Sequence, residues 1–141
     1  MTRKLSPSLW LVTIIIASIF LCGCKDEAFL TLFADPPTIA PNETSSITAV
    51  VRTGKSAATA KPMQDATVRI WIPQTEKAFA KLSNTTVTTN EQGTAVVKLT
   101  ALGTSPNKTI HVSAKAKEKN CNCPVIIKKR QSETTEGDTN E

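Results

Sequence analysis

The sequence contains few of the residues on which enzyme active sites depend. It has no tyrosine and a single histidine, His111, in 141 residues. Glycine-rich phosphate loops, serine nucleophile elbows and paired metal-binding histidines are all missing. His111 is therefore the lone candidate for a general base, and no acidic residue lies near it in the sequence to orient it. We expect no catalytic residue, no metal site and no cofactor, and hence a protein that is not an enzyme.

The chain is only mildly basic. Lysine and arginine number 17, and aspartate and glutamate number 12. Arg3 and Lys4 belong to the N-terminal segment described next, and without them the balance is 15 to 12. A net charge of this size favours solubility and weak contact with anionic groups, but it is too small to indicate nucleic-acid binding. Threonine, alanine and valine are abundant instead, which is typical of small β-strands.

Residues 1–23 have the pattern of an export signal. A basic start precedes a run from Leu9 to Leu21 that only Thr13 and Ser18 interrupt. The run is shorter than the roughly 20 apolar residues that span a bilayer, and it matches the hydrophobic region of a secretory signal. It ends at Leu21-Cys22-Gly23-Cys24, which resembles the bacterial lipobox recognised by the lipoprotein signal peptidase. The resemblance implies cleavage before Cys24; the alternative is an uncleaved N-terminal membrane anchor.

The lipobox also implies that Cys24 carries a diacylglycerol and usually a third acyl chain. Each buried methylene contributes about 0.8 kcal/mol, so several chains together make membrane attachment effectively permanent. Residues 24–27 then form the lipidated cysteine and a short spacer, which keeps the following domain close to the membrane. An Asp directly after the lipidated cysteine retains many Gram-negative lipoproteins in the inner membrane. Lys25 occupies that position here, so the outer membrane is favoured if the organism is Gram-negative.

From Ala28 onward, apolar residues alternate with polar ones in short runs, which is the pattern of half-buried antiparallel strands. We expect a first strand at Phe29–Phe33, ended by Asp35-Pro36-Pro37 because proline cannot donate to a β-ladder. Residues 74–82 predict either one or two helical turns or a loop over a sheet edge. The expected core faces are Ile47, Ala49 and Val51; Val68, Ile70 and Ile72; Ala95, Val97 and Leu99; and Ile110, Val112, Ala114 and Ala116. About six or seven such strands predict an all-β, antiparallel two-sheet sandwich over residues 28–119.

Three segments resemble the bacterial Ig-like domain group 1 of invasins and intimins. They are Asp35 to Val51, Ala66 to Ile70 and Val87 to Leu99. The most specific piece is Thr88-Thr89-Asn90-Glu91-Gln92-Gly93-Thr94-Ala95, which is similar to a corner of that family. The resemblance covers about residues 30–117. It implies an Ig-like β-sandwich that serves as a non-enzymatic binding or structural module.

The corner has a physical rationale. Gly93 allows the backbone to adopt a positive φ after the polar turn without steric cost, and the small Ala95 begins a core face where the turn meets the sheet. The loop from Gly54 to Pro62 is longer and richer in lysine and alanine than is usual in the family. It is the part of the chain that departs most from the family pattern.

Cys121 and Cys123 are separated by one residue, Asn122. In an oxidising compartment the two cysteines would normally pair, but a bridge between them closes a very small, strained ring. Three interpretations stay open: a local or intermolecular disulfide without catalytic meaning, free thiols without a special role, and a redox or metal site. Zinc requires four ligands, and His111 is expected on the solvent face of its strand, so the metal interpretation is weak.

Residues 120–141 are expected to form the Cys-x-Cys segment and a polar, disordered tail. Within this segment Val125-Ile126-Ile127 either adds an edge strand or packs on the sandwich. A basic patch is also present, and its interpretation is open between contact with anionic lipid or polymer and solvated lysines that protect a strand edge, which we favour. The patch consists of Lys115, Lys117, Lys119, Lys128, Lys129 and Arg130.

Two functions follow from these patterns. The favoured one is a lipid-anchored Ig-like module of the bacterial envelope or surface that contacts another envelope protein, a host surface or a cell-wall polymer, and no nucleic acid. The alternative is a lipid-anchored redox or metal-handling protein in which Cys121 and Cys123 act together.

Overall fold

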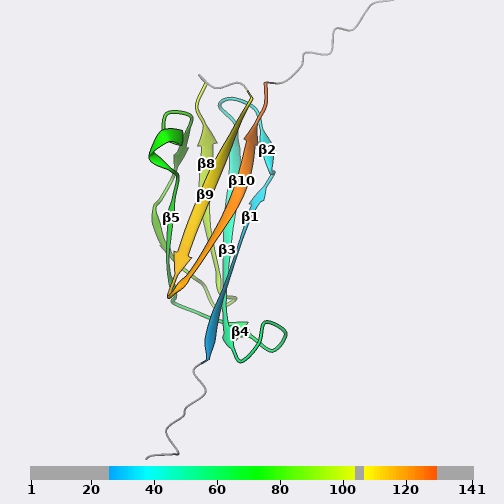
Figure 1. Ribbon diagram of the computed structural model, residues 1–141, viewed down its shortest axis with the longest axis vertical. Coiled ribbons are helices and arrows are strands. Elements are labelled where there is room, and N and C mark those ends of the chain that lie inside the picture. Colours follow the sequence, from blue (N-terminus) through cyan, green and yellow to red (C-terminus); the bar gives the residue numbers. More distant parts are fainter. Residues whose placement is uncertain (1–25, 104–106, 130–141) are drawn as a thin grey trace, which may run out of the picture.

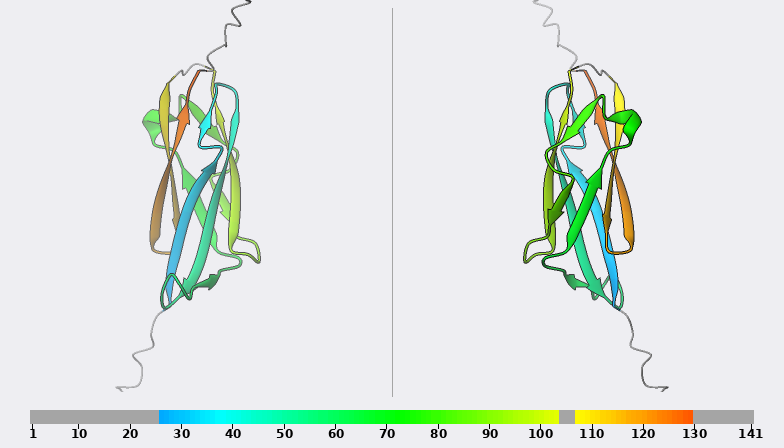
Figure 2. Two further views of the ribbon diagram at one scale, coloured as in Figure 1. Left: turned by 90° about the vertical axis from the view of Figure 1, so that its right-hand side faces the viewer. Right: turned by 90° about the vertical axis from the view of Figure 1, so that its left-hand side faces the viewer.

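The computed structural model describes residues 26–103 and 107–129, which form two packed β-sheets (Figures 1 and 2). In chain order the elements are β1 (Glu27–Asp35), β2 (Thr38–Ile39), β3 (Thr44–Gly54), β4 (Lys61–Pro62), β5 (Thr67–Trp71), the 3-10 helix η2 (Gln74–Glu76), β6 (Ala80–Leu82), β7 (Thr86–Thr88), β8 (Thr94–Ala101), β9 (Lys108–Ala116) and β10 (Lys119–Ile127). The export signal with Leu21, Cys22, Gly23 and Cys24, and the tail from residue 130, lie outside the described residues. The lipidation of Cys24 therefore stays a prediction.

The two sheets confirm the expected all-β sandwich. In the first sheet the strand order is β1-β3-β8-β6, with the short β4 also pairing with β3. In the second sheet the order is β2-β10-β9-β5-β7. Every strand pair is antiparallel except β2 and β10, which run parallel, so the expectation of a purely antiparallel sandwich is wrong at this one edge.

The parallel pair arises where the chain crosses from one sheet to the other. β1 pairs with β3 in the first sheet, and the cis Asp35-Pro36 bond and Pro37 end it, as the sequence predicts. The chain then joins the edge of the second sheet as β2, where the Ile126 N–H donates to the Pro37 carbonyl at 2.9 Å. The fully buried Ser45 stabilises the bend, because its hydroxyl donates to the Pro36 carbonyl at 2.7 Å.

The alternating residues fill the space between the sheets, as expected. All four predicted core faces are buried, and the largest fully buried side chains include Ile47, Ile70, Leu99 and Ile110. Because successive side chains of a strand point to opposite faces, this burial places the intervening polar residues outside. The core is therefore set by the period-two pattern of the sequence.

The sandwich continues past residue 119, where the sequence analysis placed its end. β10 contains Cys121, Cys123 and the apolar triplet, and it pairs with β9 along its whole length. Pro124 is tolerated in this strand because of the direction in which its backbone nitrogen points. The Ile126 N–H points to the β2 side, so the Pro124 nitrogen, two residues earlier, points the same way, and β2 pairs only with Ile126 and Ile127.

The corner around Gly93 has the predicted geometry. Gly93 has a φ of 70°, and Ala95 is buried. A Cβ atom at position 93 would meet the Val51 carbonyl oxygen and would lie 2.9 Å from the Met63 nitrogen. The Asn90 side chain closes the turn by accepting the N–H groups of Gln92 and Thr94, each at 3.0 Å.

Candidate functional site

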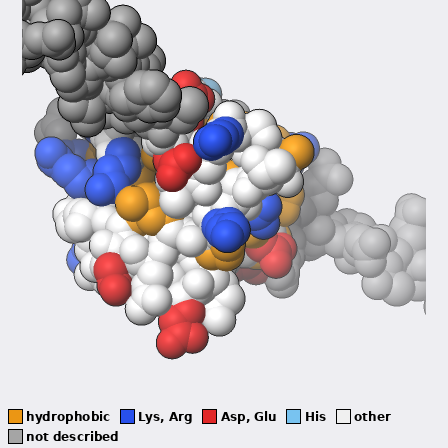
Figure 3. Space-filling model, turned by 90° about the horizontal axis from the view of Figure 1, so that it is seen from below, with side chains coloured by type: hydrophobic (Ala, Val, Ile, Leu, Met, Phe, Trp, Pro, Cys, Tyr) orange, Lys and Arg blue, Asp and Glu red, His pale blue; other side chains and the backbone are white. Residues whose placement is uncertain are grey.

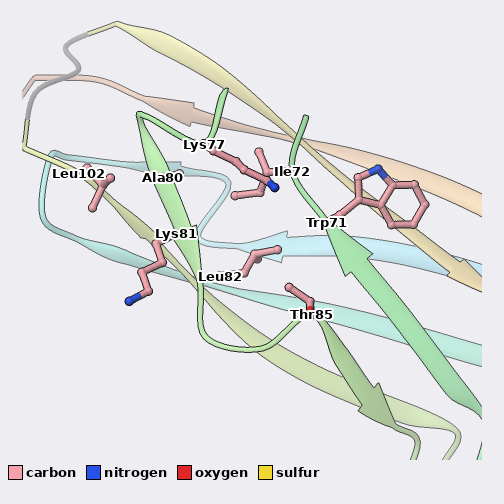
Figure 4. A pocket seen from close by; sticks show the side chains of 8 residues that line it. All are labelled: Trp71, Ile72, Lys77, Ala80, Lys81, Leu82, Thr85 and Leu102. Atoms are coloured by element: carbon pink, nitrogen blue, oxygen red, sulfur yellow. The ribbon is translucent and has the colours of Figure 1, made fainter. Parts of the chain in front are cut away.

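An open groove of about 340 Å³ lies between the two sheets on the side where β6 and β5 end (Figure 4). Residues of β5 and the segment after it form one wall, and residues of β6 and the end of β8 form the other. The lining residues are Trp71, Ile72, Lys77, Ala80, Lys81, Leu82, Thr85 and Leu102. Residues 74–82, which the sequence left open between helical turns and a loop, form η2 and then the edge strand β6.

β6 borders the groove with an unpaired strand edge. Among the strands of residues 26–103 and 107–129 it pairs only with β8, and it ends its sheet. The Leu102 N–H donates to the Phe79 carbonyl and the Ser83 N–H donates to the Lys98 carbonyl, each at 2.8 Å. Since these bonds alternate along an antiparallel pair, the N–H and C=O groups of Ala80 and Leu82 point away from β8. Leu82 is half-buried, so its groups are available to an added strand, whereas Ala80 is 2% exposed and its groups are covered.

The groove is apolar inside and basic at its rim. Leu82 and Leu102 are half-buried, Ile72 is buried, and Trp71 is 40% exposed. Lys77 and Lys81 are exposed, and no carboxylate lines the groove. The site therefore suits an apolar group with a negative charge beside it.

Glu76 holds η2 against β9 next to this groove. Its Oε2 atom accepts the His111 backbone N–H at 2.6 Å, and its Oε1 atom lies 2.9 Å from His111 Nδ1. His111 is exposed, as expected, but it does have an acidic partner, which the sequence did not reveal because Glu76 is 35 residues away. Within the described residues no hydroxyl or thiol bonds to the His111 ring, so the pair fixes a turn and lacks a nucleophile.

Cys121 and Cys123 are free thiols on the inward face of β10. Cys123 is 8% exposed and belongs to the core, and Cys121 packs against the core at its margin. Burial, and secondly the proximity of Cys121, raise the pKa of the Cys123 thiol above its ordinary value. A reactive cysteine requires a lowered pKa and access to solvent, so this arrangement is that of a packing residue.

The predicted basic patch does not form one cluster. Lys117 and Lys119 lie at the turn between β9 and β10, whereas Lys128 and Lys129 follow the opposite end of β10. At about 3.3 Å per residue, the nine residues of β10 separate the two groups by roughly 30 Å. Arg130 lies outside the described residues.

Neither a metal site nor a membrane-spanning helix is found in the described part of the chain. Residues 26–103 and 107–129 contain no group of three or more metal-ligating side chains. No helix within the same ranges is long and apolar enough to cross a membrane.

The sequence analysis did not identify the groove. Its residues come from separate elements, and its shape depends on the pairing of β6 with β8, which only three residues define. One indication was available: Trp71 alternates with the core residues Ile70 and Ile72 on the solvent face of its strand, and tryptophan is enriched at interfaces.

Comparison with known proteins identifies the fold and no family. No protein-family model and no curated protein sequence matches the chain. Membership of the bacterial Ig-like group 1 therefore stays a prediction.

Among solved structures, domains 4 and 5 of the S-layer protein SbsC are 15% identical over 72% of this chain, with a TM-score of 0.50. Domains 1–6 of SbsC are 14% identical over 75% of this chain, with a TM-score of 0.51. This chain covers 54% of the first of these structures and 14% of the second. At such identities the likeness concerns the sandwich fold alone.

Proposed function

We propose that this protein is a lipid-anchored, non-enzymatic binding module of the bacterial cell envelope that captures an extended segment of another envelope protein. The observation that carries the proposal is the apolar groove beside the unpaired edge of β6. In strand addition, main-chain hydrogen bonds to a sheet edge supply affinity, and a neighbouring pocket selects side chains. The outward backbone groups of Leu82 would supply the first, and the groove with Lys77 and Lys81 would select an apolar residue near a carboxylate.

The orientation of the domain supports a tethered binding role. Asp26 is the first described residue, and the chain reaches β1 at the lower end of the sandwich in Figure 1. The groove lies nearer the opposite end, because Leu102 follows the upper end of β8. An anchor on Cys24 would place the lower end at the membrane and leave the groove accessible. Figure 3 shows acidic and basic side chains interspersed on that lower end.

Crosslinking in the native cell tests the binding role. A photo-crosslinking amino acid at Lys81, on the β6 edge, is expected to capture one defined envelope protein through an extended apolar and acidic segment. The matched control is the same substitution at Lys98, which is exposed on the central strand β8. Equal capture at both positions would contradict the proposed site.

A peptide of the crosslinked segment then tests strand addition. Leu82→Pro removes the outward N–H and the side chain, whereas Leu82→Val keeps the donor. We expect at least about tenfold weaker binding for Leu82→Pro, which corresponds to about 1.4 kcal/mol. Similar affinities for the two variants would exclude hydrogen bonding along β6.

Mass spectrometry of membrane fractions tests the anchor. The N-terminal peptide is expected to begin at an acylated Cys24, and Cys24→Ala is expected to accumulate as an unprocessed precursor that starts at Met1. If the organism is Gram-negative, Lys25 favours the outer-membrane fraction. An unmodified Cys24 in mature protein would overturn the lipoprotein proposal.

A further inference from the structure

The outer face of the second sheet forms a second surface, which shares Trp71 with the groove. β9 and β10 lie at the front of the molecule in Figure 1. Arg69, Trp71 and Lys115 line a shallow hollow of about 290 Å³ on this face. We propose that this hollow, called here the Trp71 face, binds an acidic polysaccharide, with a sugar ring stacked on Trp71 and a carboxylate held between Arg69 and Lys115.

The strand register places the three residues together. Arg69 pairs with Lys115 and Trp71 pairs with Ser113 across β5 and β9. Residues two apart on a strand share a face, so the two cations lie next to each other and the indole lies one step along the strands. All three side chains are exposed, Trp71 to 40%.

Among the described residues, the two cations have no ion-pair partner. Like charges directly opposite each other in a sheet are destabilising. Neither Arg69 nor Lys115 forms an ion pair with any described residue. The five strands of this sheet also contain no Asp or Glu. A bound carboxylate would relieve the repulsion and accept charge-assisted hydrogen bonds from both side chains.

Small polar side chains surround the hollow. Thr86 pairs with Arg69 on one side, and Asn120 pairs with Lys115 on the other. Asn122 pairs with Ser113 beside the indole. Hydroxyl and amide groups both donate and accept hydrogen bonds, which matches the hydroxyl groups of a sugar. The aromatic face of Trp71 offers the apolar surface on which a sugar ring can lie.

The same features disfavour two other anionic partners. Single-stranded nucleic acids bind sheets through several stacking aromatics, whereas Trp71 is the only Phe or Trp in the strands of this sheet. Anionic membranes bind clusters of four to eight basic residues together with inserted apolar groups. The Trp71 face has two cations at its centre and runs along the flank of the sandwich, not across the end where the chain begins (Figure 1).

Affinity measurements on the full-length protein in neutral detergent test the proposal, with polygalacturonate as the probe. Arg69→Gln with Lys115→Gln is expected to weaken binding about tenfold or more, because both charge-assisted hydrogen bonds to the carboxylate are lost. Arg52→Gln with Lys98→Gln, at exposed positions of β3 and β8 outside the groove, removes the same charge from the other sheet and should leave the affinity within about twofold. Trp71→Thr should also weaken binding without any change of charge.

Further probes and a stability measurement complete the test. Neutral dextran is expected not to bind, and DNA and phosphatidylglycerol vesicles are expected to bind more weakly than polygalacturonate. The thermal midpoint of Arg69→Gln with Lys115→Gln should equal or exceed that of the wild type, since the repulsion is gone. The proposal is overturned if both double variants lose affinity equally, if Trp71→Thr binds normally, or if DNA or vesicles prove the tighter ligand at these residues.

Discussion

The Glu76 carboxylate binds His111 twice, accepting the backbone N–H at 2.6 Å through Oε2 and lying 2.9 Å from Nδ1 through Oε1. The two residues belong to η2 and β9, so the contact fixes the segment between β5 and β6 onto the second sheet. Lys77, the next residue, lines the groove. The geometry of the groove therefore depends on a bond made outside it.

Loss of this contact should destabilise the turn. We expect Glu76→Ala to lower the free energy of unfolding by about 1 kcal/mol, since the bonds involve a charged acceptor but the His111 side chain is 55% exposed. Urea denaturation measures the change. Gln74→Ala, at an exposed position of the same turn, is the control and should change stability by less than about 0.5 kcal/mol. Equal effects would show that the Glu76 bonds contribute nothing.

Thr89 should matter through its hydroxyl. It is 2% exposed, donates to the Met63 carbonyl at 2.6 Å and accepts the Ala66 N–H at 2.9 Å. Thr89→Val keeps the shape but leaves both backbone groups unsatisfied, which costs about 1–3 kcal/mol. The neighbouring Thr88→Val, at an exposed site, should be nearly neutral in the same denaturation experiment. A neutral Thr89→Val would mean that water replaces the hydroxyl.

The core faces could be predicted because each depends on local alternation, and the period of two determines which residues are buried. The extension through β10 was predicted only as an open alternative for Val125-Ile126-Ile127, because Pro124 interrupts the pattern and is tolerated only through the position of β2. The groove could not be predicted from the sequence either. Its walls meet through the register of β6 with β8, and the sequence around Phe79 fits a helical turn as well as a loop over a sheet edge.

Gly93 should not tolerate a side chain. Its positive φ disfavours other residues, and an added Cβ would meet the Val51 carbonyl oxygen and the Met63 nitrogen, which are backbone atoms that cannot move away easily. We expect Gly93→Ala to lower the free energy of unfolding by about 2 kcal/mol or more. Gln92→Ala, in the same turn and exposed, should have little effect. Thermal denaturation measures the unfolding midpoints of the two variants, and equal midpoints would contradict the expectation.

The two thiols should differ in reactivity. Cys123 is buried in the core and Cys121 is only half-buried at its margin. Native protein treated with iodoacetamide should therefore be alkylated first at Cys121, and Cys123 should react on the timescale of unfolding. Peptide mass spectrometry at successive times follows each site. Faster labelling of Cys123 would revive the redox interpretation of the pair.

The raised pKa of Cys123 predicts a loss of stability at alkaline pH. Above the thiol's ordinary pKa of about 8.5 the unfolded chain releases this proton while the folded chain retains it, so the unfolded state binds fewer protons and the free energy of unfolding falls as pH rises. The contribution is complete below that value and is lost as pH rises through the folded-state pKa. The Cys123→Val variant has no thiol at this position and therefore lacks this pH-dependent contribution to stability.

Urea denaturation between pH 7 and pH 10 should thus show a steeper decline for the wild type than for Cys123→Val. Taking the difference between the two proteins cancels the contribution of every group that does not interact with Cys123. Parallel curves, or a steeper decline in the variant, would show that the Cys123 thiol ionises as readily in the folded protein as in the unfolded chain. The Cys123 side chain would then have to be exposed to solvent in the folded protein at that pH.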